Sequence, residues 1–254
     1  MTETTSPSRE GSRSVRVGIL QAEPAGGIRA GEIEKFRQSG VQILVLPEYF
    51  WLESDDRDHG HAARHAEATL DRMSELSRGW SVVGGTFVEP SEGGGWHNSC
   101  PVFEDGREIA RYRKINLMPG ELENGARPGC SFVTVTVAGG VRLAPVICAD
   151  VLDAATFSSV ASLGADLIVS PVASPYLPED SVEAKEKRDR EIFVGGAVRA
   201  GAPIVKVCGV GSVFHHRLQG RSLVATPAGL LFRTPYNREN ERGAWVVDVP
   251  LPHR

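Results

Sequence analysis

The sequence has few cysteines and no segment that marks a secreted or membrane protein. Only Cys100, Cys130, Cys148 and Cys208 occur among 254 residues, and no two form a C-x-x-C pair. This usage predicts free thiols in a reduced, cytoplasmic setting rather than a disulfide framework. There is no signal peptide and no apolar run long enough to span a bilayer, so we expect no membrane partner.

An excess of basic residues is also absent. The formal net charge is −4 and 24% of the residues are charged, which gives no indication of a nucleic-acid partner or a membrane-surface partner. The composition is ordinary for a globular protein. Residues 1–13 are polar without an apolar period and predict a disordered tail. No linker-like shift divides the remainder, so 14–254 is predicted to form one domain.

Short apolar runs alternate with helical patterns and hairpin signals. The nearly continuous apolar run 41–46 predicts a strand buried on both faces. Residues 98–103 and 108–112 predict a hairpin around the Asp105-Gly106 turn. Longer helical patterns cover 58–79 and 181–200. Together these elements predict an α/β fold in which parallel strands and antiparallel hairpins are mixed.

One buried strand is predicted to end on a cysteine. Residues 143–147 are apolar, Cys148 follows them, and 151–163 has a helical composition. A strand end fixes the backbone, and the N–H groups that follow would point at whatever the sulfur attacks. A helix N-terminus also lowers the pKa of a thiol. A lone cysteine is more often buried and inert, however, so a catalytic role for Cys148 requires partners elsewhere in the chain.

Three histidines fall within the first long helical pattern. His61 and His65 share a helix face at i, i+4, with His59 nearby, so a zinc site is conceivable. No cysteine or clear carboxylate ligand completes it, and the stretch is rich in Ala, Arg and Glu like a solvated face. We therefore predict no metal.

Polar residues at other predicted strand ends change the interpretation of Cys148. The segments are Leu44-Val-Leu-Pro-Glu48-Tyr-Phe, Tyr112-Arg-Lys114-Ile-Asn-Leu and Val146-Ile-Cys148-Ala-Asp150. Flanking them in order are Trp96-His-Asn98-Ser99, the strand 164–170, and the late hairpin that contains Gly220-Arg-Ser222. This series, from about Val15 to Val249, resembles the nitrilase superfamily, the carbon–nitrogen hydrolases with a Glu-Lys-Cys triad.

The resemblance implies a fold and a set of roles. The fold is a four-layer α-β-β-α sandwich of two mixed sheets, assembled as a homodimer or a higher homo-oligomer, without a cofactor. Cys148 would be the nucleophile and Glu48 the general base and acid. Lys114 and the backbone N–H of Ala149 would hold the oxyanion.

The family also has a second glutamate in the loop after the lysine. Glu121 and Glu123 both lie there, and Glu123 fits the spacing better. Tyr49 and Asn116 are expected to line or support the substrate pocket. Three positions depart from the usual pattern, namely Ala149, Asn116 and Cys208, and they put the substrate in doubt more than the reaction class.

The expected activity is hydrolysis of a small linear amide or carbamoyl (ureido) compound to an acid and ammonia, through a thioester on Cys148. A nitrilase that forms a thioimidate is the first alternative, because the triad is the same. An acyltransferase that passes the thioester to an amine is the second. A catalytically silent binding protein on the same scaffold is the third, and the intact triad argues against it.

Overall fold

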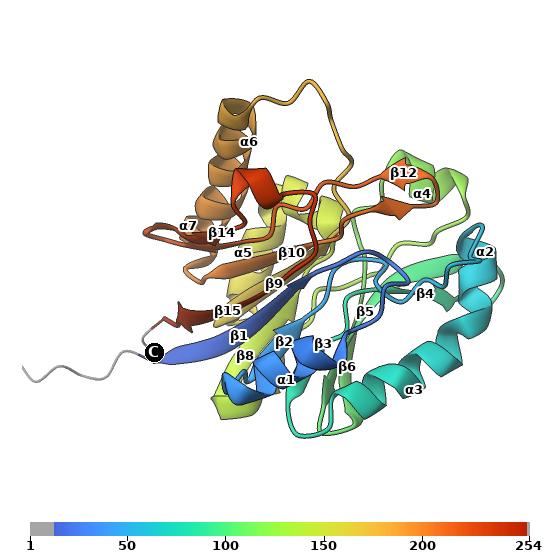
Figure 1. The fold of residues 1–254 in the computed structure, drawn as a ribbon, viewed down its shortest axis with the longest axis horizontal. Helices are drawn as coiled ribbons and strands as arrows, with labels where there is room; N and C mark the ends of the chain where they lie inside the picture. Colours follow the sequence, from blue (N-terminus) through green and yellow to red (C-terminus); the bar gives the residue numbers. More distant parts are fainter. Residues whose placement is uncertain (1–12, 253–254) are drawn as a thin grey trace, which may run out of the picture.

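The computed structural model describes residues 13–252 and consists mainly of two β-sheets with helices outside them (Figure 1). The first sheet has the strand order β15-β1-β2-β3-β5-β4, with β6 paired to β5. Its strands are β1 (Ser14–Gln21), β2 (Ile43–Val45), β3 (Ser81–Val83), β4 (Phe87–Pro90), β5 (Trp96–Glu104), β6 (Arg107–Arg113) and β15 (Gly243–Pro250). β1, β2 and β3 are parallel, whereas the other pairings are antiparallel, so the sheet is mixed.

The second sheet repeats this arrangement in the other half of the chain. Its order is β14-β13-β10-β9-β8-β7, in which β8, β9 and β10 are parallel. Its strands are β7 (Val135–Val137), β8 (Val141–Pro145), β9 (Leu167–Val172), β10 (Ile204–Cys208), β13 (Leu223–Thr226) and β14 (Gly229–Arg233). A separate two-stranded ribbon is formed by β11 (Ser212–Val213) and β12 (His216–Arg217).

The largest apolar core lies between the two sheets. Val17 and Val45 of the first sheet share it with Leu143, Val169 and others of the second, all fully buried. Because the central strands are parallel and carry apolar side chains on both faces, the outer faces need helices to cover them.

Helices provide that cover on both sides. The helices are α1 (Ala30–Gln38), α2 (His59–Ala62), α3 (Ala66–Leu76), α4 (Pro119–Glu123), α5 (Ala154–Ser162), α6 (Val182–Asp189) and α7 (Gly195–Ala200). Phe36 of α1 and Met73 of α3 pack on the first sheet, while Phe157 of α5 and Ala197 of α7 pack on the second. The predicted four-layer α-β-β-α sandwich of two mixed sheets is therefore confirmed.

Two helices differ from their predicted form. The pattern 58–79 is divided into α2, a 3-10 turn at Ala63–His65, and α3. Asp58 caps α2 by accepting a hydrogen bond from the His61 N–H. The pattern 181–200 is one path interrupted by a π-helical turn at Arg190–Val194 between α6 and α7. π-Helical turns are rare in proteins, and those that occur often lie at functional sites.

Residues 1–12 of the predicted N-terminal tail lie outside the described residues. Arg13, which the prediction included in the tail, instead lies next to β1 and donates a hydrogen bond to Asp166 at 3.3 Å. Within 13–252, no helix combines the length and the apolar character that crossing a bilayer requires.

Leu143 tests the core between the sheets. Its side chain is fully buried on β8, so Leu143→Ala should lower the free energy of unfolding by about 2–5 kcal/mol. Leu231 on β14 is 48% exposed, and Leu231→Ala should change it by less than about 0.5 kcal/mol. Urea unfolding followed by circular dichroism measures both. Equal losses in the two variants would contradict this assignment of the core.

Candidate active site

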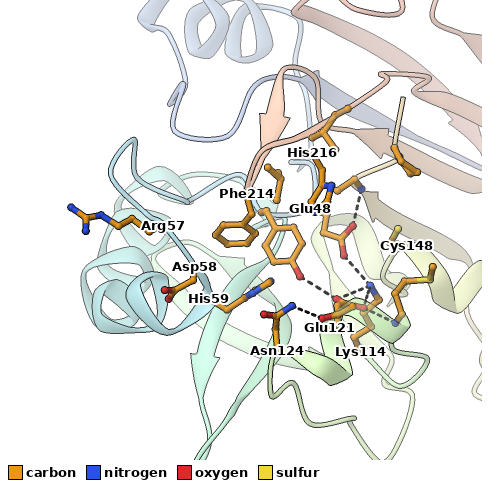
Figure 2. A pocket seen from close by; sticks show the side chains of 17 residues that line it. Glu48, Arg57, Asp58, His59, Lys114, Glu121, Asn124, Cys148, Phe214 and His216 are labelled. Carbon is orange, nitrogen blue, oxygen red and sulfur yellow. Dashed lines mark hydrogen bonds and ion pairs between the residues drawn. The ribbon is translucent and has the colours of Figure 1, made fainter. Parts of the chain in front are cut away.

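Three reactive side chains from separate strand ends meet at one end of the sandwich. Glu48 follows β2, Lys114 follows β6, and Cys148 follows β8 at the start of a 3-10 turn, Cys148–Leu152. All three line a cavity of about 540 Å³. Figure 2 shows them converging, with α4 and the β11–β12 ribbon beside them. Parallel strands bring their carboxyl ends to the same edge of a sheet, and this geometry brings distant sequence segments together.

Lys114 lies between two carboxylates. Its Nζ donates to Glu48 Oε1 at 3.1 Å and to both oxygens of Glu121 at 2.9 and 2.8 Å. Lys114 and Glu48 are at most 2% exposed and Glu121 is 8% exposed. A buried ammonium is costly unless it is paired and hydrogen-bonded, and here every proton donor has an acceptor within reach.

The charges in this group set its protonation. Burial opposes ionisation of Lys114, but the negative charges of Glu48 and Glu121 outweigh it and hold the pKa of Lys114 above its ordinary value. Burial likewise raises the pKa of Glu121, and Lys114 more than compensates, so the net shift is downward. Burial dominates at Glu48, whose pKa is raised. Lys114 thus holds Glu121 as a carboxylate, whereas burial makes Glu48 the more readily protonated of the two.

Asn98 holds the two glutamates together. Its Nδ2 donates to Glu48 Oε1 at 2.8 Å and to Glu121 Oε1 at 3.0 Å, and it lies 3.2 Å from the Tyr49 hydroxyl. The Tyr49 hydroxyl in turn donates to Glu121 Oε1 at 3.1 Å. Sequence reasoning did not assign Asn98 to the site, although its Trp96-His-Asn98-Ser99 segment belonged to the family resemblance.

The prediction that Glu123 accompanies Lys114 is wrong. The expected loop contains α4, a short helix that starts at Pro119, a favourable first residue. Glu121 Oε2 accepts the Met118 N–H at 2.8 Å, which caps the helix and aims this carboxylate at Lys114. Two residues later the helix has turned by about 200°, so Glu123 is exposed to solvent.

Cys148 sits on a strained turn. Its φ is +42°, a left-handed conformation that costs a non-glycine residue about 1–3 kcal/mol and is common at functional sites. Asp150 stabilises the turn: its carboxylate accepts the Ile147 N–H, the Asn116 N–H and the Tyr112 hydroxyl, each at 2.8 Å. The backbone turn at Cys148 is therefore held by a buried hydrogen-bonded carboxylate two residues downstream.

The predicted lowering of the Cys148 pKa is wrong. Burial raises the pKa of the thiol, and the neighbouring Glu48 charge raises it further while Lys114 opposes the shift. The helix that was expected to lower it, α5, starts only at Ala154, because the 3-10 turn intervenes. Burial therefore favours the neutral thiol at Cys148, which lines the same cavity as Glu48.

The three predicted pocket residues have different positions. Tyr49 lines the cavity with Cys148. Ala149 lines a second, adjoining cavity that also reaches Cys148. Asn116 lines neither of these two cavities, and its backbone N–H instead supports Asp150. The prediction that Asn116 takes part in substrate binding is corrected to a supporting contact through the backbone.

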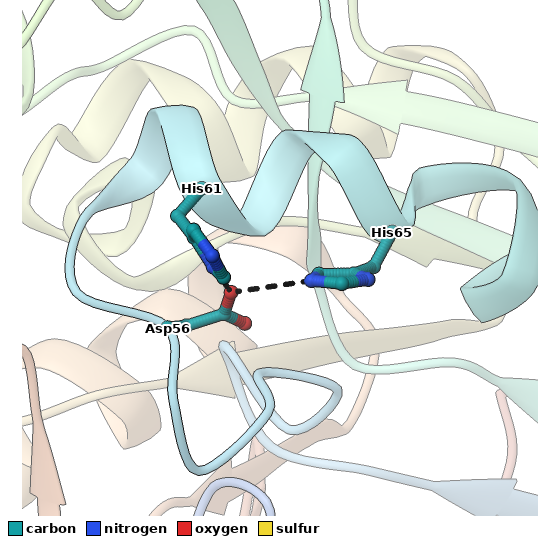
Figure 3. Close-up of side chains that lie close together, drawn as sticks. All are labelled: Asp56, His61 and His65. Carbon is teal, nitrogen blue, oxygen red and sulfur yellow. Dashed lines mark hydrogen bonds and ion pairs between the residues drawn. The ribbon is translucent and has the colours of Figure 1, made fainter.

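The histidines of the 58–79 region separate into two groups. His59 lines the cavity and stacks on Trp96 with centroids 4.0 Å apart; burial lowers its pKa to about 4. His61 and His65 both face Asp56, whose Oδ1 is 2.7 Å from His61 Nδ1 and 3.8 Å from His65 Nε2 (Figure 3). A carboxylate thus does accompany these histidines, contrary to the sequence argument; that no metal is bound stays a prediction.

Comparison with known proteins assigns the family. The sequence profile of the carbon-nitrogen hydrolases matches residues 30–253, most of the chain. The chain belongs to the carbon-nitrogen hydrolase family. It is also similar in fold to a solved glutamate-to-glutamine mutant of an amidase of the nitrilase superfamily from Nesterenkonia sp. AN1, which carries the acetamide moiety of fluoroacetamide on its active-site cysteine. That likeness has a TM-score of 0.77 at 21% identity and covers 97% of this chain and 94% of the amidase.

Two curated relatives are longer proteins, and this chain matches only part of each. A glutamine-dependent NAD(+) synthetase of Rhodobacter capsulatus is 25% identical over 84% of this chain and 40% of its own. The omega-amidase NIT2 of Pongo abelii is 30% identical over 56% of this chain and 54% of its own. The chain thus spans about half or less of the length of these relatives.

The two loop glutamates supply a matched pair of variants. Glu121→Gln removes the charge that fixes Lys114 and should lower the turnover of an amide by about 10²–10³-fold, the loss typical of one oxyanion donor. Glu123→Gln changes an exposed helix residue and should leave turnover within about two-fold. Steady-state ammonia release measures both. A crippled Glu123→Gln or an unaffected Glu121→Gln would contradict this placement.

Proposed function

We propose that the enzyme hydrolyses a small linear amide or carbamoyl (ureido) compound to an acid and ammonia, through a thioester on Cys148. The observation that carries this proposal is the convergence of three side chains on one cavity. The Cys148 thiol and the Glu48 carboxylate both line it, and this carboxylate accepts from Lys114 at 3.1 Å. A nucleophile, a base and a cation are therefore within reach of one bound carbonyl group.

The first step forms the carbon–sulfur bond. Glu48 accepts the thiol proton as the sulfur attacks the carbonyl carbon, and the carbonyl π electrons move to the oxygen. Because the pKa of the Cys148 thiol is raised, proton removal and attack are best coupled. Lys114 and the Ala149 N–H then stabilise the oxyanion. The proton stays within the site, so the summed charge of the buried group does not change.

The second half of the reaction reverses these roles. Glu48 returns its proton to the amide nitrogen and the C–N bond breaks. Ammonia leaves, and the acyl group stays on Cys148 as a thioester. Glu48 then deprotonates a water molecule that attacks the thioester, and the carbon–sulfur bond breaks to release the acid and restore the thiol. The Ala173 N–H, which donates to Glu48 Oε2 at 2.7 Å, keeps this carboxylate in position throughout.

Hydrolysis of an amide is favoured over hydrolysis of a nitrile and over transfer of the acyl group to an amine. A thioester leads to the acid in one hydrolytic step, whereas a thioimidate from a nitrile must first choose between losing ammonia and losing the thiol. The amidase and omega-amidase names of the relatives support the same choice. Faster ammonia release from a nitrile than from its matching amide would favour a nitrilase, and efficient hydroxamate formation with hydroxylamine would favour an acyltransferase.

Assembly and location complete the proposal. We infer a homodimer or a higher homo-oligomer in the cytoplasm. Leu152, Leu163 and Val198 are 63%, 39% and 59% exposed next to or on α5 and α7, and these apolar side chains support packing of the outer helices against a second copy.

Mass spectrometry tests the nucleophile. Incubation of the protein with a small amide should give a transient adduct on Cys148 whose mass is that of the amide less ammonia. Cys148→Ala should lose the adduct and turnover while retaining its fold, whereas Cys130→Ala, at an exposed cysteine, should retain both. Ammonia release without any adduct from Cys148→Ala would remove Cys148 from the mechanism.

The pH profile tests Glu48. Its pKa is raised above the ordinary 4.5, and only the ionised form can accept the thiol proton. The value of kcat/KM should therefore be full above that raised pKa and fall as pH decreases through it. Glu48→Gln should lose about 10²–10⁴-fold in rate and lack this acid limb. Glu123→Gln should keep the limb; a limb that persists in Glu48→Gln would assign it to another group.

A further inference from the structure

A second cavity reaches Cys148 from the side of the second sheet. It has a volume of about 300 Å³ and adjoins the cavity that holds Glu48 and Lys114. The two cavities share Met118, Cys148, Ala173 and Pro175. The nucleophile therefore lies at their junction, and an acyl group attached to its sulfur has two directions in which to extend.

A buried guanidinium with unused donors lines the second cavity. Arg221, just before β13, is 5% exposed. Among the described residues, its Nε and Nη1 have no hydrogen-bond partner, and its Nη2 is 3.9 Å from Asp189 Oδ1, beyond hydrogen-bond distance. Burying charged donors without acceptors is costly, and each one present in a folded protein requires an explanation. A ligand whose oxygens accept hydrogen bonds from Arg221 would explain these unpartnered donors.

The surroundings of Arg221 carry an excess of positive charge. Lys206, 2% exposed, contacts Asp189 at 3.3 Å, and Arg233 and Lys185 share Glu239 at 2.9 Å each. Arg188 pairs with Asp180. The cluster thus comprises five cations and three carboxylates, which leaves two positive charges uncompensated; the members are Lys185, Arg188, Lys206, Arg221, Arg233, Asp180, Asp189 and Glu239.

Most of the other residues that line the second cavity are apolar. Val151, Leu177, Ile192 and Phe193 line it together with Cys148 and with four members of the charged cluster, Arg188, Asp189, Lys206 and Arg221. Ile192 and Phe193 belong to the π-helical turn at Arg190–Val194, so this rare helical turn shapes the wall. Methylene groups suit such a wall, and an anion suits the charged end beyond it.

The first cavity has the opposite charge. Glu48, Glu121 and Asp58 line it with only Lys114 and Arg57 as fixed cations. A negative group on the acyl chain would be repelled there and attracted to Arg221 in the second cavity. The charge distribution therefore distinguishes the two directions for an anionic acyl chain.

We propose that the second cavity is the acyl subsite and that Arg221 binds a carboxylate at the far end of the substrate. The substrate class is then a monoamide of a short dicarboxylic acid, with its apolar methylenes along Ile192 and Phe193. A planar carboxylate can pair with the Nη1 and Nη2 donors at the end of a guanidinium or with Nε and Nη2 along its side, and either contact uses one of the two unpartnered donors of Arg221. Lys206 supplies part of the positive field. This proposal rests on the proposed function, because it places the acyl chain of the same thioester.

Kinetics on two matched amides test the subsite. Glutaramate and pentanamide share the amide and three methylenes, and only glutaramate ends in a carboxylate. The wild type should prefer glutaramate, and Arg221→Met should raise its KM for glutaramate about 10–100-fold, the range expected for hydrogen bonds to a charged group, while its KM for pentanamide should change by a much smaller factor. Arg199→Met, at an exposed arginine of α7, is the control. An equal effect on both amides, or no preference in the wild type, would overturn the proposal.

Binding to a protein that cannot turn over separates this proposal from the reaction. Glutarate should bind Cys148→Ala in calorimetry, and it should bind at least about 10-fold more weakly when Arg221→Met is added. Arg221→Lys keeps the charge without the fork and serves if the methionine variant does not fold; it too should weaken binding. Arg221-dependent glutarate binding without hydrolysis of any amide would refute the proposed function alone. Hydrolysis without glutarate binding, or tighter binding of inorganic phosphate than of glutarate, would refute the carboxylate subsite alone.

Discussion

The paired burial of Lys114 and two glutamates is the constraint on which the rest of the site depends. An ammonium taken out of water is tolerated only where carboxylates surround it, and Glu48 and Glu121 both contact its Nζ within 3.1 Å. The pairing leaves one negative charge in excess. Because Glu121 is held ionised by Lys114 and the Met118 N–H, Glu48 is the more readily protonated of the two carboxylates. The electrostatic balance that stabilises the folded site thus gives the two glutamates different proton affinities.

The sandwich converts this local balance into a defined geometry. Glu48, Lys114 and Cys148 follow three strands of two different sheets, and the buried core between those sheets prevents the strand ends from moving independently. Asp150 adds a specific restraint, since its three hydrogen bonds link the Cys148 turn to the segment after Lys114 through Asn116 and Tyr112. A strained nucleophile conformation persists because the surrounding contacts over-determine it.

Charge also divides the space around the sulfur. The cavity with Glu48 and Glu121 is negative, and the cavity with Arg221 and Lys206 is positive. Protonated ammonia leaves more readily toward the first, and an anionic acyl group is held more readily in the second. One thiol at the junction of two oppositely charged spaces therefore imposes an orientation on any substrate that has an anionic end.

The sequence by itself determined the elements that depend on local pattern: the buried strand before Cys148, the hairpin leading to Lys114, and an α/β alternation with mixed strands. The resemblance to the nitrilase superfamily supplied the two-sheet sandwich and pointed to Glu48, Lys114 and Cys148 as one site. Tertiary structure decided which side chains join them. Glu121 rather than Glu123 reaches Lys114 because a short helix sets their directions, and the Cys148 thiol pKa rises because a 3-10 turn keeps α5 away from it. Asn98 and Arg221 gain their roles from neighbours distant in the chain. Burial and charge pairing are sums over contacts between remote segments, so a pattern read along one segment does not contain them.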